Sequence, residues 1–393
     1  MEQKRVLFIS PQPFLQWRGS PIRVKFNLLA LTAAGYQVDL LALPVGEDVA
    51  IDGLTIHRAP NPFRVKHVPI GPNGWKLFFD VFLFFMGLRL CLKHRYTVIH
   101  GVEEAGFIAT LLGGIFRTAS IFEKHSDPAS YKAGVLKNLV LRAYAQVERI
   151  TARRANAVIG TGPGLARQVE AMGRHAPVFN IPDIPSSIEE PTESDRETIR
   201  AAWHVGPDHV VALYVGSFAI YQGVELLFAS IPLAIRQAPD VRFVIIGGAA
   251  SEIAAYRAEL ERQGVADQVL FAGTIAPDRL PSFLAAADIL LSTRISGLNS
   301  PLKLLDYLKT GRAIAATDVP ANHTILTGET AVFAPPTPDA YAGLIVDLTR
   351  DANHRHQLGA AGRRIYEDNY TFRHHQERLR ACYEAAIHHH SRT

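Results

Sequence analysis

The sequence predicts an α/β protein of two domains, each built on a parallel sheet with helices on both faces. Three observations support this prediction. The chain has 393 residues, which is too long for one hydrophobic core and suits two domains of ordinary size. Short apolar runs alternate with helix-length segments in the first half, as is typical of parallel sheets. After a polar stretch the same alternation begins again.

The first domain is expected over residues 1–185. A helix is expected over residues 22–34, and further helix-length segments follow the later strands. The strand-like runs themselves lie at 5–10, 37–43, 97–100, 119–123 and 157–160.

A linker is predicted over residues 186–206, where the chain is rich in Pro, Ser and acidic residues and has no apolar period. The second domain is expected over 207–365, with strands in VVALYVGS, VRFVIIGG, QVLFAG, ADILLST and RAIAAT. The tail from residue 351 reads as two helices that break near 369–372. We expect the last segment, 366–393, to be a helix that packs towards the first domain.

The most apolar segment is WKLFFDVFLFFMGLRLCLK, residues 75–93. Its uninterrupted apolar part is shorter than the roughly 20 residues that a membrane-spanning helix needs, and Asp80 and Arg89 interrupt it. A buried amphipathic helix is the favoured interpretation. The alternative is a helix on the membrane surface, which would give the protein a peripheral membrane contact at the inner membrane face.

Composition narrows the class of protein. The net charge is +4, but the basic residues are scattered and not interleaved with aromatic ones, so no nucleic acid partner is expected. Cys91 and Cys382 lie far apart without metal-ligand spacing, which argues against a disulfide framework or a zinc site. The N-terminus lacks the pattern of a secretory signal, so a cytoplasmic location is expected.

Ligands of open α/β sheets bind at the carboxyl ends of the strands, which directs attention to particular loops. After the first strand, Gly19 allows close backbone approach, Ser20 can cap a helix and Pro21 suits its first position. The free amide groups at such a helix start favour an anion. A plain capped helix is the alternative for this loop.

Two later strands end in polar clusters that would form a crevice floor at the same edge. Together they could supply an acid, a base and hydroxyl-binding groups. His125, Glu103 and Asp127 are the catalytic candidates, and a solvated loop residue is the alternative for each. The full set is His100, Glu103, Glu104, His125 and Asp127.

The segment STRISGLNSPLKLLDYLKTGRAIAATD carries the most information in the second domain. Ser300, after Asn299, can cap a helix that Pro301 begins, which leaves Lys303 in the first turn after Leu302. The helix dipole disfavours a cation there by about 0.3–1 kcal/mol, and a bound anion would remove that penalty.

Lys303 and Asp306 share one helix face, so they could hold a diphosphate and a ribose respectively. A simple ion pair between the two is the alternative. Near the start of this domain, Gly216 and Ser217 end a strand and Gln222 precedes a helix. That loop is a second candidate phosphate site.

These motifs together resemble the family four glycosyltransferases, which have the GT-B architecture of two facing Rossmann-like domains. The resemblance implies that Gly19 approaches the diphosphate of the donor, that His125 contacts the donor sugar and that Asp306 binds ribose. It further implies a retaining, metal-independent transfer from a nucleotide diphosphate sugar to a saccharide or lipid-linked saccharide, with no other cofactor.

The chain departs from the family pattern at several positions. Many members have an Arg and a Lys where Ser217 and Gln222 stand here, and two glutamates where Leu298 and Asp306 stand. Lys303 and the helix amides would then carry more of the charge stabilisation at the leaving diphosphate. Two alternatives stay open: a sugar-nucleotide epimerase that uses Glu103, Glu104 and Asp127, and a non-catalytic subunit that binds a nucleotide sugar.

Overall fold

The computed structural model describes residues 4–14, 19–68, 74–127, 135–173, 176–296 and 301–392. It consists of two compact units. The first contains Met1–Asp183 and Phe372–Thr393, and the second contains Ile184–Thr371. The chain therefore leaves the first unit once and returns to it for its last helix.

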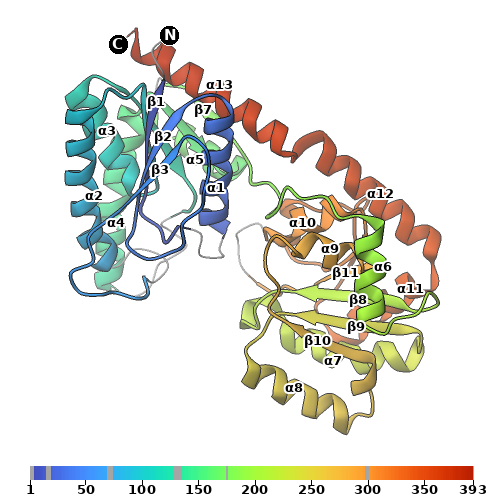
Figure 1. Cartoon of the computed structure of the whole chain (residues 1–393). Helices are drawn as coiled ribbons and strands as arrows, with labels where there is room; N and C mark the ends of the chain where they lie inside the picture. The colour runs from blue at the N-terminus through green and yellow to red at the C-terminus, as the bar shows by residue number, and fades with distance from the viewer. Residues whose placement is uncertain are drawn as a thin grey trace. The chain divides into compact units, whose positions relative to one another are not determined.

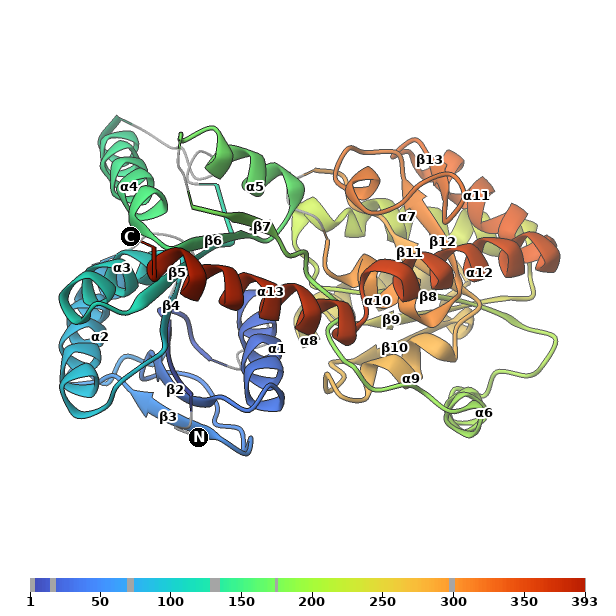
Figure 2. The same ribbon diagram turned by 90° about the horizontal axis from the view of Figure 1, so that it is seen from above.

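The first unit has an all-parallel sheet of seven strands in its described residues, in the order β3-β2-β1-β4-β5-β6-β7 (Figures 1 and 2). The elements are β1 (Arg5–Ser10), α1 (Gly19–Ala33), β2 (Gln37–Ala42), β3 (Leu54–Arg58), α2 (Gly74–Lys93), β4 (Val98–Val102), α3 (Ala105–Phe116), β5 (Ala119–Lys124), α4 (Val135–Arg154), β6 (Ala157–Gly160), α5 (Pro163–Glu170), β7 (Val178–Asn180) and α13 (Phe372–His390).

Alternate side chains of the buried strands pack on opposite faces of this sheet. Val6 and Phe8 of β1 belong to the core beneath α1 and α13. Leu7 and Ile9 belong to the core beneath α2 and α3. Because both faces of a parallel sheet are covered, its strands read as continuous apolar runs in the sequence.

The C-terminal helix α13 is part of the first unit's core. Its buried side chains Leu379, Cys382, Tyr383 and Ala386 pack with residues of β1, β4 and α1. The preceding helix, α12 (Ala352–Asn369), belongs to the second unit.

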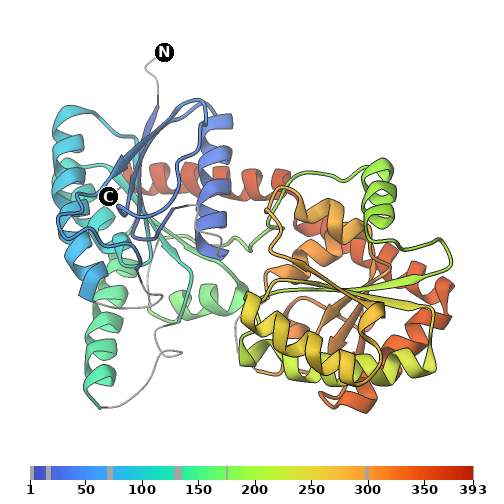
Figure 3. The same ribbon diagram turned by 60° about the horizontal axis from the view of Figure 1, so that its bottom comes forward.

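The second unit has a six-stranded parallel sheet in its described residues, seen from another side in Figure 3. Its strand order is β10-β9-β8-β11-β12-β13, and these strands are labelled in Figure 2. This is the strand order of a Rossmann fold. Its elements, besides α12, are α6 (Glu193–Ala202), β8 (Val210–Val215), the 3₁₀ turn η2 (Ile220–Gln222), α7 (Val224–Gln237), β9 (Val241–Ile246), α8 (Ala250–Arg262), η3 (Ala266–Gln268), β10 (Val269–Gly273), α9 (Leu280–Ala285), β11 (Ile289–Ser292), α10 (Lys303–Thr310), β12 (Ala313–Thr317), η4 (Asn322–Thr324), β13 (Val332–Ala334) and α11 (Pro338–Arg350).

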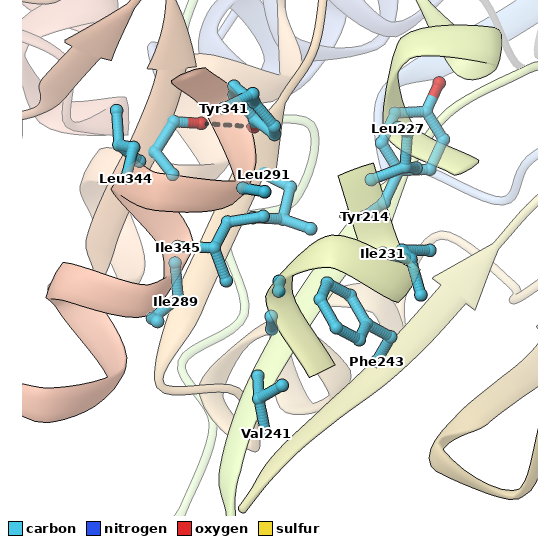
Figure 4. Packing of buried hydrophobic residues seen from close by; sticks show 14 of the residues in the cluster. Tyr214, Leu227, Ile231, Val241, Phe243, Ile289, Leu291, Tyr341, Leu344 and Ile345 are labelled. Carbon is cyan, nitrogen blue, oxygen red and sulfur yellow. Dashed lines mark hydrogen bonds between the residues drawn. The ribbon is translucent and has the colours of Figure 1, made fainter. Parts of the chain in front are cut away.

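Helices α7 and α11 cover one face of the second sheet, and Figure 4 shows side chains of that core in close packing. Ile231 of α7 and Ile345 of α11 pack with Phe243 and Leu291 of the strands. The buried Tyr341 hydroxyl donates to the carbonyl of Ala315, 2.8 Å away. Its polar end is therefore satisfied at no cost to the core.

The structure differs from the sequence prediction in several respects. It contains three strands that were not expected, β3, β7 and β13. The expected linker contains α6, which Thr192 begins by exchanging hydrogen bonds with Asp195 in a capping box, and whose Ile199 is buried. Helix α2 is not wholly buried: Phe79, Leu83 and Gly87 face the core, whereas several other apolar side chains are exposed. In the part of the chain that the structure describes, no helix is long and apolar enough to cross a membrane.

Candidate functional site

The first unit's candidate site lies at the carboxyl edge of its sheet, where the strand order reverses between β1 and β4. Ligands of open α/β sheets bind in the crevice at such a switch point. Three predicted residues from separate loops meet here. His125 follows β5, and its Nδ1 lies 2.9 Å from the Ser20 hydroxyl at the start of α1. The backbone amide of His125 donates to Glu103 Oε1, also 2.9 Å away, after β4.

A buried carboxylate, Glu123, stands directly behind His125. Its Oε1 lies 3.3 Å from His125 Nε2 and also accepts from Arg23 Nε. Its Oε2 accepts from Asn27 Nδ2 at 2.8 Å and lies 2.9 Å from His100 Nε2. Sequence inspection did not select Glu123 because three of these partners lie about a hundred residues away or on another strand.

The charge of Glu123 is stabilised by its neighbours. Burial alone would raise its pKa, but Arg23, His125 and the hydrogen bonds from both histidines outweigh that effect and hold the pKa well below its usual value. An ionised carboxylate next to the imidazole fixes the ring orientation, as such carboxylates do in catalytic histidine sites.

The other residues predicted for this crevice lie in different surroundings. His100 is fully buried and does not form the crevice floor, because its two ring nitrogens contact Glu123 and the Tyr383 hydroxyl, which is 2.8 Å away. Glu104 pairs with Lys76 at 2.8 Å. Asp127 accepts from Gln168 Nε2 of α5 at 3.0 Å. Gly19 begins α1 and has open space around it.

Of the three predicted catalytic residues, His125, Glu103 and Asp127, Glu103 is the one with a buried carboxyl group. Burial raises its pKa, and the nearby His125 only partly offsets this effect. Besides the His125 amide, its other oxygen lies 3.5 Å from the Tyr144 hydroxyl of α4. A carboxyl group with a raised pKa at a sheet edge is a common arrangement for proton transfer.

The second unit's candidate site lies at its own switch point, between β8 and β11. Lys303, the first residue of α10, is half-buried there, and its Nζ lies 3.3 Å from both the Val215 carbonyl and Gln222 Oε1. The same ammonium lies 4.6 Å from the centre of the Tyr214 ring. Burial, and then repulsion from Arg294, lowers the pKa of Lys303 to about 7.

Arg294, two residues after the end of β11, is a second cation at this place, and it is buried. Sequence inspection missed it. It is 7% exposed, its Nε donates to the Ser296 carbonyl at 2.8 Å, and its guanidinium lies 5.3 Å from the centre of the Tyr221 ring. Neither Arg294 nor Lys303 forms an ion pair with a carboxylate among the described residues. The sequence offered one signal for Arg294: it is a basic residue that follows a buried strand and has no acidic neighbour in the sequence.

Glycines bring the backbone close together at the same switch point. A side chain at Gly223 would come within 1.9 Å of the Thr293 carbonyl, and one at Gly247 would come within 2.0 Å of the Gly216 carbonyl. Both glycines have positive φ, which other residues rarely adopt. Ser217 contributes its carbonyl to the Tyr214 hydroxyl at 3.0 Å.

Asp306 has a partner that the sequence did not predict. Its Oδ1 accepts from the Ser186 backbone amide at 2.7 Å and from the Ser186 hydroxyl at 2.9 Å. Burial raises its pKa to about 6, although the bonds from Ser186 act against this. Leu302 precedes α10 in helical conformation. Asn299 and Ser300, the predicted cap, lie outside the described residues.

Comparison with known proteins covers both units. The protein-family model described as glycosyl transferase 4-like domain matches residues 24–182. A second protein-family model, described as glycosyl transferases group 1, matches residues 209–351. A GDP-mannose-dependent alpha-(1-6)-phosphatidylinositol monomannoside mannosyltransferase of Mycolicibacterium smegmatis is 27% identical over 221 residues, which are 53% of this chain and 56% of that protein. Spore coat protein SA of Bacillus subtilis is 26% identical over 184 residues, 44% of this chain and 48% of that protein.

The chain thus matches about half the length of these curated relatives. Solved structures show the same fold along nearly the whole chain. A sucrose-phosphate synthase from Thermosynechococcus elongatus has a TM-score of 0.74 at 20% identity and covers 97% of this chain and 98% of its own. Anabaena HepE in complex with UDP has a TM-score of 0.70 at 13% identity and covers 96% and 98%.

Proposed function

Since the chain belongs to the family four glycosyltransferases of GT-B architecture, we propose that it moves a sugar from a nucleotide diphosphate sugar to a saccharide or lipid-linked saccharide acceptor. The observation that carries this proposal is a pair of cations, the buried Arg294 and the half-buried Lys303, at the switch point of the second unit. Charges withdrawn from water are normally paired, and neither of these has a carboxylate partner in the described part of the chain.

The donor diphosphate is the anion that would pair with them. Gly216 and Gly223 have no side chains, so the backbone close to the two cations is free of side-chain atoms at these positions. Lys303 lies at the start of α10, where the helix dipole also favours an anion. Anabaena HepE, which shares the fold, has been solved with UDP and with UDP-glucose. Many family members have an Arg and a Lys in the loop after β8, where this chain has Ser217 and Gln222. In this proposal Arg294 supplies positive charge in their place.

The proposed transfer is retaining and metal-independent. Arg294 and Lys303 neutralise the charge that develops on the departing diphosphate, which is the part of the reaction that fixed cations stabilise most. In the first unit, His125 and Glu103 contact the sugars, and Glu123 acts as a positioning residue behind His125. The anomeric form of the product, read by NMR, and the rate in the presence of EDTA test these two features.

Ribose binding by Asp306 needs a specific geometry. Because Oδ1 already accepts two hydrogen bonds from Ser186, the ribose hydroxyls would be bound by Oδ2. Asp306→Asn would then weaken both donor binding and the contact with Ser186.

A thermal-shift screen of nucleotide diphosphate sugars tests the proposed function. Donor binding raises the stability of the folded state by mass action, and a shift of about 5 °C is expected near a hundred times the dissociation constant. Arg294→Ala and Lys303→Ala should remove the shift. Arg262→Ala, a change at an exposed arginine of the same unit, should retain it. The proposal fails if no donor shifts the wild type, or if all three variants respond alike.

The same screen, followed by an acceptor pool, separates the enzyme from its alternatives. A transferase releases nucleotide only when an acceptor is added, apart from slow hydrolysis. An epimerase converts the sugar without any acceptor, and a binding subunit shows the thermal shift but no release.

A further inference from the structure

A large apolar pocket opens in the first unit between helices α2, α3 and α4. Its volume is about 740 Å³, which lies within the range of about 300–1,000 Å³ that small-molecule sites occupy. Helix α3 lies between the other two helices, as Figure 2 shows. The apolar lining includes Leu77, Val81, Phe107, Leu111, Phe122 and Val147.

The walls of this pocket include apolar side chains that are exposed to solvent among the described residues. Leu77 is 70% exposed and Val81 52% exposed, although both belong to a helix whose other side packs in the core. A contiguous apolar surface of this kind, next to a site, marks a binding groove more often than a chance exposure.

One residue of the pocket lining also belongs to the candidate site. Glu103 lines the pocket and also accepts the hydrogen bond from the His125 amide at 2.9 Å. Tyr144 of α4, whose hydroxyl lies 3.5 Å from Glu103 Oε2, lines it as well. The pocket is therefore continuous with the groups proposed to contact the sugars.

The ionisable groups along the pocket favour an uncharged head group. Four carboxyl groups, those of Asp80, Glu103, Glu104 and Glu148, line it against the ammonium of Lys76. Burial raises the pKa values of Glu103 and Glu148, and burial followed by repulsion from Glu104 raises that of Asp80 to about 8. Carboxyl groups accept hydrogen bonds from hydroxyl groups in either protonation state. A phosphate would face these four carboxyl groups with the ammonium of Lys76 as the one cation among the described lining residues, since Lys124 is paired with Glu148 and does not line the pocket.

We propose that this pocket holds the apolar chain of a lipid acceptor whose uncharged, hydroxyl-bearing head lies at Glu103. The chain occupies the space between Val81, Leu111 and Val147, and the acceptor hydroxyl reaches the His125 loop. Asp80 contributes a buried oxygen, Oδ1, that has no hydrogen-bond partner among the described residues and can bind the head group. This assignment rests on the proposed function, because it names the acceptor of the same transfer.

The binding of two single-chain probes, measured by calorimetry below their micelle concentrations and without any donor, tests the assignment. Decyl glucoside is the neutral probe and decyl phosphate the anionic one. Wild-type protein should bind decyl glucoside saturably and decyl phosphate at least about tenfold more weakly. Leu111→Arg and Val147→Glu, at partly exposed positions in the pocket, should weaken decyl glucoside binding at least about tenfold.

Phe85→Arg is the matched control, because Phe85 is an exposed apolar residue of α2 that does not line the pocket. It should leave probe binding unchanged. Equal losses in Phe85→Arg and Leu111→Arg would overturn the assignment in favour of a general apolar surface, such as one that contacts a bilayer. Absence of saturable binding, or tighter binding of decyl phosphate, would also overturn it.

The donor thermal shift, measured on the same samples, separates this inference from the proposed function. A donor shift without probe binding rejects the pocket assignment alone. Probe binding without any donor shift rejects the proposed transfer, and with it the acceptor role, while the pocket remains a lipid site.

Discussion

Glu123 holds together residues from three parts of the first unit: Arg23 and Asn27 on α1, His100 on β4 and His125 after β5. Its neighbours stabilise the ionised form, so the carboxylate contributes to stability as well as to the orientation of His125. A buried charge in such a network is costly to remove because its partners remain buried.

Glu123→Gln should destabilise the first unit by about 3 kcal/mol or more, because Arg23 loses its buried partner. A lowered pKa gives stability that is present above the ordinary value of 4.5 and is lost as the pH falls through the folded-state value. The stability difference from wild type, measured by urea unfolding, should therefore be smaller near about pH 3 than near about pH 7. Glu377→Gln, at an exposed position on α13, should change little at either pH. A difference that stayed constant with pH would contradict this account.

Lys303 should make donor binding depend on pH. Its pKa of about 7 means that the unliganded protein loses this charge as the pH rises through neutrality. Only the protonated form attracts the diphosphate, so the affinity for a nucleotide diphosphate sugar should fall above that pH, at most about tenfold per pH unit. Lys303→Arg, which stays charged, should bind with little pH dependence. Calorimetric titrations that show the same slope for both proteins would exclude Lys303 as the cause.

At the residue scale, the sequence predicted which loops come together, but it did not predict the buried partners of the residues in those loops. Ser20, Glu103 and His125 were predicted from their places after strands, and the structure brings them within hydrogen-bond distance. Glu123 and Arg294 were not selected. Their importance comes from partners brought close by the fold, and nothing local in the sequence distinguishes them from ordinary charged residues at strand ends.

At the element scale, periodicity predicted the buried strands but not the short or half-exposed ones. The runs expected at 5–10 and 157–160 coincide with β1 and β6. In contrast, β3 has mostly half-buried side chains, and β7 and β13 have three residues each. Such segments bury few of their own side chains, so their sequences show no clear apolar period. Backbone pairing with the neighbouring strand keeps them in the sheet.

Helix α13 is the element that ties the end of the chain to the first unit. Leu379→Ala should destabilise that unit by about 2–5 kcal/mol, since Leu379 is 1% exposed in the core formed with β1 and α1. Arg380→Ala, on the exposed side of the same helix, is the control and should change stability little. Urea unfolding of both variants measures the effect. If the two changes cost the same, α13 does not contribute to the core in the way the structure shows.

At the scale of the whole molecule, the two-domain α/β architecture follows from the sequence because alternation is a property of entire segments. The structure and the comparisons with known proteins confirm it. The strand order follows less directly, since the same alternation is compatible with more than one order of a parallel sheet. The structure settles that order, and it places the second unit's cations at the point where the order reverses.

The central claim concerns the nucleotide, and a crystal structure of the protein with UDP, GDP or ADP tests it most directly. We expect the diphosphate oxygens to lie within about 3.2 Å of Lys303 Nζ and of the Arg294 guanidinium, next to Gly216. A nucleotide bound elsewhere, with Lys303 still directed at Gln222 and the Val215 carbonyl, would contradict the account.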